Sequence, residues 1–265
     1  MGAIPRRALD FDFSDVDRDW YANDPFVTAF FNAFSILLPE GERFFVDAVK
    51  RFRDLQPEAE ADIAGFIGQE AMHGRAHRGF NAMLVEQGFT QVPKYERRLR
   101  RLLDFGRRRL SARSQLGITV ALEHITALLA EQLLVTPEHN DAATGAVQRL
   151  WLWHALEETE HKHVAFDLLA QVDGSYGRRV GTMLLSSFFL VVIMSWYHVG
   201  LLRERGKLFD FGVWRRGMGK LWGEPGLLRV LIVPYLAYFA PSFHPVEHSH
   251  PDRLIQEWRQ RLALS

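Results

Sequence analysis

Two motifs of opposite order constrain this chain more than any other feature of its sequence. The first is Glu70-x-x-His73-x-x-x-His77, and the second is His154-x-x-x-Glu158-x-x-His161. Both lie in stretches whose hydrophobic spacing predicts helices. Residues three and four apart project from one face of an α-helix, so each motif presents three potential metal ligands in one direction. The two motifs therefore predict helices that face each other across a buried dinuclear metal site.

Such a site needs two more carboxylates. A four-helix bundle that holds two metals uses one Glu from each of two helices and a Glu-x-x-His from each of the other two. Glu42 opens a helix predicted over residues 41–55, and Glu123 lies in the middle of a helix predicted over residues 112–135. The metal ligands that the bundle pattern predicts are, in bundle order, Glu42, Glu70 with His73, Glu123, and Glu158 with His161.

The Glu-x-x-His spacing also occurs twice outside this set. His163, which follows Glu160 at that spacing, lies about 200° around the helix from His161 and cannot point at the same metal. Glu247 and His250 lie between two prolines, which predicts a loop.

Two residues inside the motifs have open roles. Glu157 precedes His161 by four residues and is an alternative to Glu158. We prefer Glu158 because His154 and His161 flank it on one face. His77 is either an additional ligand, in competition with His154, or a donor outside the ligand set.

The chemistry of the set favours iron. Four glutamates balance the charge of two divalent cations, so a neutral buried cluster can form where a lone carboxylate would be expensive. Mixed imidazole and carboxylate ligands disfavour Mg²⁺ and Ca²⁺ and suit two Fe ions, with Mn or Zn as alternatives. The absence of cysteine excludes thiolate sites.

Four sequence blocks resemble the bacterial proteins known as predicted metal-dependent hydrolases. The blocks are residues 39–45, 69–73, 121–124 and 151–162. The resemblance implies a ferritin-like fold with a dinuclear site. The His-x-x-x-Glu-x-x-His block also resembles the diiron arylamine N-oxygenases of the p-aminobenzoate N-oxygenase type, which implies that His154 is a seventh ligand.

The whole pattern predicts an all-α fold, namely a ferritin-like four-helix bundle with additional N- and C-terminal helices. An apolar content of 48% is enough for a sizeable core, and no linker-like segment divides the chain. We expect one domain over residues 1–265, with a metal-binding core at about 24–205 and a C-terminal helical extension at 206–265. The helices are predicted at 24–38, 41–55, 57–87, 94–109, 112–135, 140–171 and 175–205, with shorter ones after 211.

The distribution of charge and the first residues of the sequence give weaker predictions about partners and location. A net charge of zero predicts no nucleic-acid binding. Residues 95–110 contain seven arginines, which we interpret as a solvated helix face with Leu99, Leu102, Leu103 and Phe105 turned inward; binding to an acidic surface is the alternative. The first seventeen residues lack the apolar core of a signal peptide, so a cytoplasmic location is expected.

Residues 180–202 contain no charged side chain. This stretch is long enough to span a bilayer, but its polar residues and the arginines on both flanks favour a bundle helix buried on several sides. Peripheral membrane contact is the alternative, supported by the apolar run at 227–240.

These features predict a non-haem diiron enzyme that activates O2 to oxidise a small organic substrate by N-oxygenation, hydroxylation or desaturation. Its partners would be O2 and an apolar or aromatic small molecule in a pocket lined by Phe44, Phe45 or Phe66. The metal ligands would be the catalytic residues. The alternatives are a dinuclear metal-dependent hydrolase and a ferritin-like iron-binding protein. The sequence identifies no electron donor and leaves a homodimer open.

Overall fold

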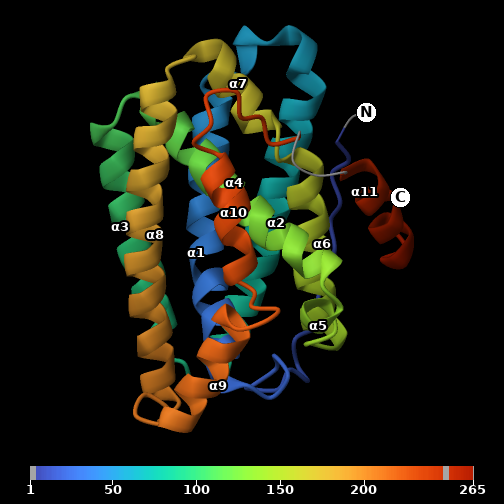
Figure 1. Cartoon of the computed structure of the whole chain (residues 1–265), viewed down its shortest axis with the longest axis vertical. Helices are drawn as coiled ribbons and strands as arrows, with labels where there is room; N and C mark the ends of the chain where they lie inside the picture. Colours follow the sequence, from blue (N-terminus) through green and yellow to red (C-terminus); the bar gives the residue numbers. More distant parts are fainter. Residues whose placement is uncertain (1–3, 247–250, 265) are drawn as a thin grey trace.

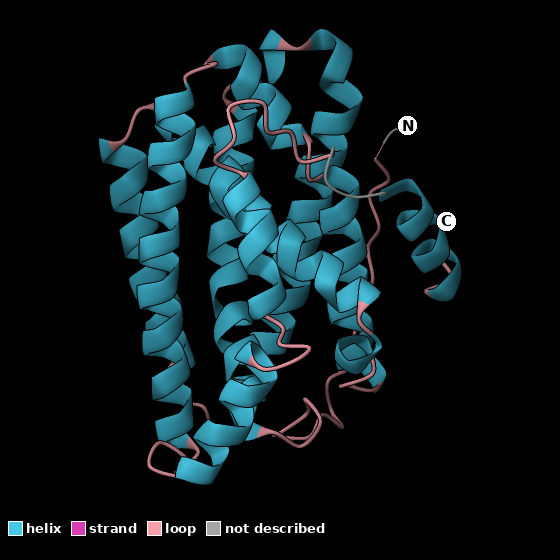
Figure 2. Cartoon of the chain, in the orientation of Figure 1, coloured by secondary structure: helices cyan, strands magenta, loops and turns pink. Residues whose placement is uncertain are grey.

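Helices make up all the regular structure in the part of the chain that the computed structural model describes, residues 4–246 and 251–264 (Figure 2). The α-helices are α1 (Pro25–Lys50), α2 (Glu60–Glu86), α3 (Val92–Arg109), α4 (Ala112–Val135), α5 (Pro137–Asn140), α6 (Gly145–His161), α7 (Val164–Val172), α8 (Tyr176–Glu204), α9 (Phe211–Trp222), α10 (Ile232–Ala237) and α11 (Pro251–Arg261). Short 3₁₀ turns lie at Arg53–Leu55, Pro57–Ala59 and Arg229–Leu231. The prediction of an all-α chain is confirmed. Glu247 and His250, predicted to lie in a loop, fall outside the described residues.

Four helices, α1, α2, α4 and α6, form a ferritin-like bundle (Figure 1). The helix α1 packs along α2, and α4 packs along α6. On the outside, α8 packs on α1 and α4, α3 packs on α1, and α10 lies against α4. This arrangement directs one side of each bundle helix at a common interior.

Capping side chains explain where the long helices begin. The Asp24 carboxylate accepts hydrogen bonds from the backbone N–H groups of Phe26 and Val27 and thereby caps α1. Ser111 caps α4, and Ser175 caps α8. Such caps satisfy N–H groups that have no partner within the helix, and each stabilises a helix by about 1 kcal/mol.

The prediction of two helices separated near Pro39 is wrong, because α1 runs through this proline. A proline inside a helix leaves the carbonyl four residues earlier without its partner. Here that carbonyl belongs to Ser35, and the side-chain amide of Asn81 on α2 donates to it at 3.3 Å. Tertiary contact thus supplies the missing bond, and Glu42 lies inside a long helix instead of at the start of one.

The helix predicted over residues 140–171 is divided into α6 and α7, and its first residue is the last residue of α5. Gly145, with φ of +60°, has the left-handed backbone that interrupts the helix before α6. A turn at residues 162–163 separates α6 from α7, directly after His161. The other predicted helices agree with the structure to within a few residues at each end.

The expectation that residues 180–202 are buried on several sides is also wrong. Only one side of α8 packs on the bundle, while Phe188 and Val191 on the other side are 62% and 64% exposed. Similarly, Leu99 of α3 is buried, but Leu102 and Phe105 are exposed. Both α4 and α8 have the length and composition of membrane spans, with 61% of the apolar window of α4 buried inside the protein but only 28% of that of α8. Composition alone does not distinguish these two environments.

The N-terminal segment before α1 lies against the bundle. Ile4 packs so closely on α2 that a Cβ atom at Gly65 would lie 2.5 Å from its atoms. The carbonyl of Pro5 accepts a hydrogen bond from Gln69, also on α2. At the other end of the chain, the indole of Trp258 on α11 donates to the carbonyl of Leu134. Both ends are therefore fixed near α6 (Figure 1).

Candidate metal centre

The bundle brings all seven predicted ligands together in its interior. Glu42 comes from α1, Glu70 and His73 from α2, Glu123 from α4, and the other three from α6. They form two groups, in each of which one potential ligand atom per residue lies within 4.8 Å of the others: Glu42, His73 and His154; and Glu70, Glu123, Glu158 and His161. All seven residues are buried.

Glu158 lies between the two groups. Its Oε1 atom is 3.1 Å from His154 Nε2, 3.6 Å from His161 Nε2 and 3.7 Å from His73 Nδ1. The hydroxyl of Thr126 donates to its Oε2 atom at 2.7 Å. Glu158 therefore occupies the position of a carboxylate that could bridge two ions, and Glu157 does not.

Buried polar atoms without hydrogen bonds mark the centre. Among the described residues, both carboxylate oxygens of Glu42, Glu70 and Glu123 are buried without a hydrogen bond, as are Nδ1 of His73 and Nε2 of His161. Three of these eight atoms lie close together, because His161 Nε2 is 3.1 Å from Glu70 Oε1 and 3.3 Å from Glu123 Oε2. Burying polar atoms without hydrogen bonds is expensive, and here they belong to neighbouring residues. Oxygen and imidazole donors in this number fit transition-metal ions.

Outer hydrogen bonds fix two of the imidazole rings. Nδ1 of His161 donates to Oε1 of Gln69 at 2.9 Å, and Nε2 of His73 donates to Oε2 of Glu157 at 3.0 Å. In the neutral ring, each bond leaves the opposite nitrogen free of its proton and directed at the centre. Metal-binding histidines commonly have such a partner, which fixes the tautomer and raises the basicity of the ligand.

His77 supplies the corresponding partner for the third ring. Its Nε2 atom is 3.0 Å from Nδ1 of His154, and its Nδ1 atom is 2.8 Å from the Ser35 hydroxyl. Because that hydroxyl donates its hydrogen to Asn81, it accepts from Nδ1 of His77. His77 must then accept from His154, which leaves Nε2 of His154 available to a metal. His77 thus lies outside both ligand groups.

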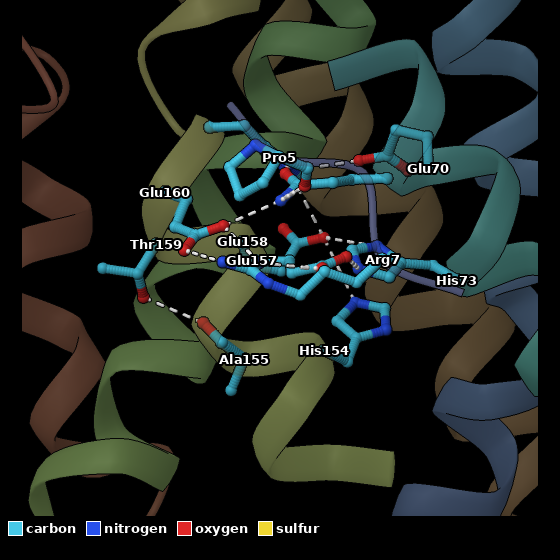
Figure 3. A network of polar contacts seen from close by, with 12 residues as sticks. Pro5, Arg7, Glu70, His73, His154, Ala155, Glu157, Glu158, Thr159 and Glu160 are labelled. Carbon is cyan, nitrogen blue, oxygen red and sulfur yellow. Dashed lines mark hydrogen bonds and ion pairs between the residues drawn. The ribbon is translucent and has the colours of Figure 1, made fainter. Parts of the chain in front are cut away.

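A buried ionic cluster lies next to the centre (Figure 3). The guanidinium of Arg7 contacts Glu157 at 3.0 Å and Glu160 at 2.8 Å, and all three residues are buried. Glu160 also accepts hydrogen bonds from Gln69 and Arg259. The cluster therefore holds both Gln69 and Glu157, which are the partners of His161 and His73.

Sequence reasoning did not identify Arg7, Gln69 or Arg259. The available signal was the presence of Glu157 and Glu160 beside Glu158 on a helix predicted to be buried, since buried carboxylates require cationic partners. That signal predicts that cationic partners exist, but it does not identify which residues they are.

The electrostatics of the centre reflect an excess of carboxylates. Burial, and then repulsion from neighbouring carboxylates, raises the pKa of Glu42 and Glu70 well above its usual range. Burial and Glu158 raise the pKa of Glu123 to about 7. Burial alone would lower the pKa of His161, but the carboxylates of Glu123, Glu158 and Glu70 raise it well above its ordinary value. Positive charge at the centre would relieve this repulsion.

Glu158 differs from the other carboxylates. Burial opposes its ionisation, but the imidazoles of His154 and His161 outweigh burial and hold its pKa well below the usual range. Burial lowers the pKa of His73 and His77, so both rings are neutral. A neutral imidazole and an ionised carboxylate are the forms that bind metals.

A family model described as "Predicted metal-dependent hydrolase" matches residues 5–249. The chain belongs to this family. No curated protein and no solved structure matches the chain. The matched range includes both motifs and Arg7, so the predicted resemblance to the metal-dependent hydrolases is confirmed, whereas the resemblance to the arylamine N-oxygenases stays a prediction.

In this member of the metal-dependent hydrolase family, a cavity of about 300 Å³ adjoins the candidate metal centre. It lies between α1, α3, α4 and α8, and Glu42 and Thr126 are part of its wall. Phe44 and Phe45 line it, as predicted. Phe66 does not; its ring instead packs edge-on against His161, with ring centres 4.9 Å apart. The rest of the lining is almost entirely apolar.

Proposed function

We propose that this chain is a dinuclear metal enzyme that acts on an apolar organic substrate. The observation that carries the proposal is the position of buried ligand atoms without hydrogen bonds beside an apolar cavity, with Glu42 belonging to both. The cavity is in the size range of small-molecule sites. A metal site with a structural role alone would have no need of such a cavity.

Hydrolysis is the reaction that the family description supports. Glu42, His73 and His154 would hold one ion, and Glu70, Glu123 and His161 the other, with Glu158 between them. Two such ions would supply a Lewis acid and an activated water nucleophile. In this chain Thr126 holds the Glu158 carboxylate, while Phe44 and Phe45 keep bulk water away from the substrate.

Oxidation by O2 at two irons is the second candidate. Its specific support is the cavity wall, which presents hardly any polar group to stabilise the anionic intermediate of hydrolysis. Four carboxylates also offset the charge of two Fe(II) ions, as argued from the sequence. A ferritin-like storage role has no comparable support from the cavity.

Metal loading under controlled atmosphere distinguishes the candidates. The metal-free chain would be loaded with two equivalents of Zn²⁺, Mn²⁺ or Fe(II) without O2 and assayed against alkyl esters, amides and phosphoesters. Hydrolysis predicts turnover with Zn²⁺ or Mn²⁺ in the absence of O2. Oxidation predicts rapid O2 uptake and a transient visible absorption with Fe(II) alone. Failure to bind two equivalents of any of these metals would contradict both.

A further inference from the structure

The cavity opens between two helices on the surface. Leu102, Phe105 and Arg109 of α3 and Leu185 and Phe189 of α8 belong to its wall. All four of these apolar side chains are at least 40% exposed, so they face both the cavity and the outside. Its inner end, by contrast, is at Glu42. The cavity therefore connects the metal centre to the outer face of α3 and α8.

That outer face is a continuous apolar surface. On α8 it consists of Leu184, Leu185, Phe188, Phe189, Val191, Val192 and Trp196, all exposed. The helix α10 continues it with the exposed residues Ile232, Val233 and Leu236, and its Tyr235 hydroxyl is 2.9 Å from that of Ser187 on α8. Figure 1 shows α3 and α8 along the left edge of the bundle and α10 in front of the bundle, to the right of α8. A surface of this extent marks an interaction site.

Positive charge accompanies the apolar surface. Arg98, Leu102, Phe105 and Arg109 follow one another at spacings of four, three and four, so they form one stripe along α3. The Arg98 guanidinium lies 4.8 Å from the ring centre of Trp196, which places it at the edge of the α8 surface. The acidic residues of α3 have other partners, because Glu96 binds Asn81 and Asp104 binds Arg107. This face is therefore apolar with a cationic border, although the whole chain has no net charge.

The attachment of α8 to the bundle excludes a simple membrane span. Its Tyr197 hydroxyl donates to the carbonyl of Tyr95, and His198 donates to the carbonyl of Phe26. Met183, Leu201 and Leu202 on the same side are fully buried. A helix held along its length in this way can lie on a bilayer, with its free side buried in the interface, but cannot cross one.

We propose that the face formed by α3, α8 and α10 docks on a bilayer that contains anionic lipids, and that the cavity takes the alkyl chain of an amphiphile from that bilayer. The apolar side chains enter the interface, and the arginines contact the lipid phosphates. The alkyl chain enters between Phe105 and Phe189, and the bond to be transformed lies near Glu42. The docking depends on the surface alone, whereas the substrate class rests on the proposed function.

Vesicle sedimentation with the full chain tests the docking. We expect binding to vesicles of phosphatidylglycerol and phosphatidylcholine, weaker binding to pure phosphatidylcholine, and loss of more than tenfold in affinity with the double variant Phe188→Glu, Val191→Glu. The matched control is Leu55→Glu, which adds a charge at an equally exposed leucine in the turn between α1 and α2. Replacing Arg98 and Arg109 with Gln should weaken anionic binding by about fivefold per arginine. Equal sedimentation of all variants, or a stable dimer by light scattering that leaves vesicles unbound, would overturn the docking.

A dansyl-labelled undecanoic acid tests the cavity. Gly41 lines the cavity, and a Cβ atom there would meet only Phe45, at 3.9 Å. Gly41→Leu should therefore fill the cavity and abolish the fluorescence increase on probe binding, while metal content and vesicle binding stay unchanged. Gly219→Leu, at an open position on α9, is the control. Undiminished probe binding by Gly41→Leu would refute the chain-binding role, and normal metal content would show that the metal centre itself is intact.

Discussion

Replacing Arg7 with methionine should both destabilise the protein and weaken its affinity for metal. The guanidinium is the cationic partner of Glu157, and it shares Glu160 with Arg259. Methionine keeps much of the apolar stem but leaves Glu157 buried without its cation. Removing one partner of a buried ion pair costs about 3–5 kcal/mol.

The lower end of this range applies here, because Glu157 can take up a proton. Burial already raises its pKa to about 7 with Arg7 present, so the variant would hold the neutral acid at pH 7. A loss of about 3 kcal/mol corresponds to a decrease in Tm of about 6–12 °C for a protein of this size. A neutral Glu157 is also a weaker acceptor for His73, and changes to such partners typically reduce metal affinity about 10–100-fold.

Urea unfolding of the metal-free protein and competitive metal titration measure the two effects separately. Arg6→Met is the matched control, since Arg6 is the neighbouring arginine and is exposed. If Arg7→Met and Arg6→Met unfold at the same urea concentration and bind metal equally well, the buried cluster has no role in supporting the centre.

Three further changes test the centre itself. Glu158→Ala should abolish binding of the metal pair, seen as a fall in metal content by mass spectrometry, whereas Glu138→Ala at an exposed position should retain the wild-type content. His77→Ala should weaken metal binding about 10–100-fold because His154 loses its acceptor, with equal affinity in a titration arguing against the role of His77. Metal affinity should rise between pH 6 and pH 8. The pKa of Glu123 is raised to about 7 and that of His161 is also raised, so metal ions must displace protons from these groups at the lower end of this window. Calorimetry in buffers of different ionisation enthalpy would detect those protons, and a pH-independent affinity without proton release would contradict the argument.

The candidate ligand set could be proposed from sequence because its information is local. Spacings of three and four residues place Glu70 beside His73 and Glu158 beside His161 whatever the rest of the chain does. The order of helices in a bundle then supplies Glu42 and Glu123. The location of these residues in one interior agrees with that prediction.

Features that depend on distant residues could not be predicted in this way. Pro39 signals a helix end, and only the amide of Asn81 on another helix explains why α1 continues. The role of His77 depends on Ser35, which decides the direction of its hydrogen bonds. An uncharged stretch such as 180–202 has the same composition in a core, in a membrane or on a surface. Whether this stretch is buried or exposed depends on which other parts of the chain pack against it.

The distance along the chain between Arg7 and its partners has a consequence for biosynthesis. Arg7 leaves the ribosome before Glu157 and Glu160, which follow 150 and 153 residues later. Until α6 has been made, the guanidinium lacks both of its carboxylate partners, and His73 lacks its acceptor. Truncated chains that end before α6 should therefore neither fix their N-terminal segment nor hold the ions. Metal capture is thus restricted to chains whose synthesis has passed this helix.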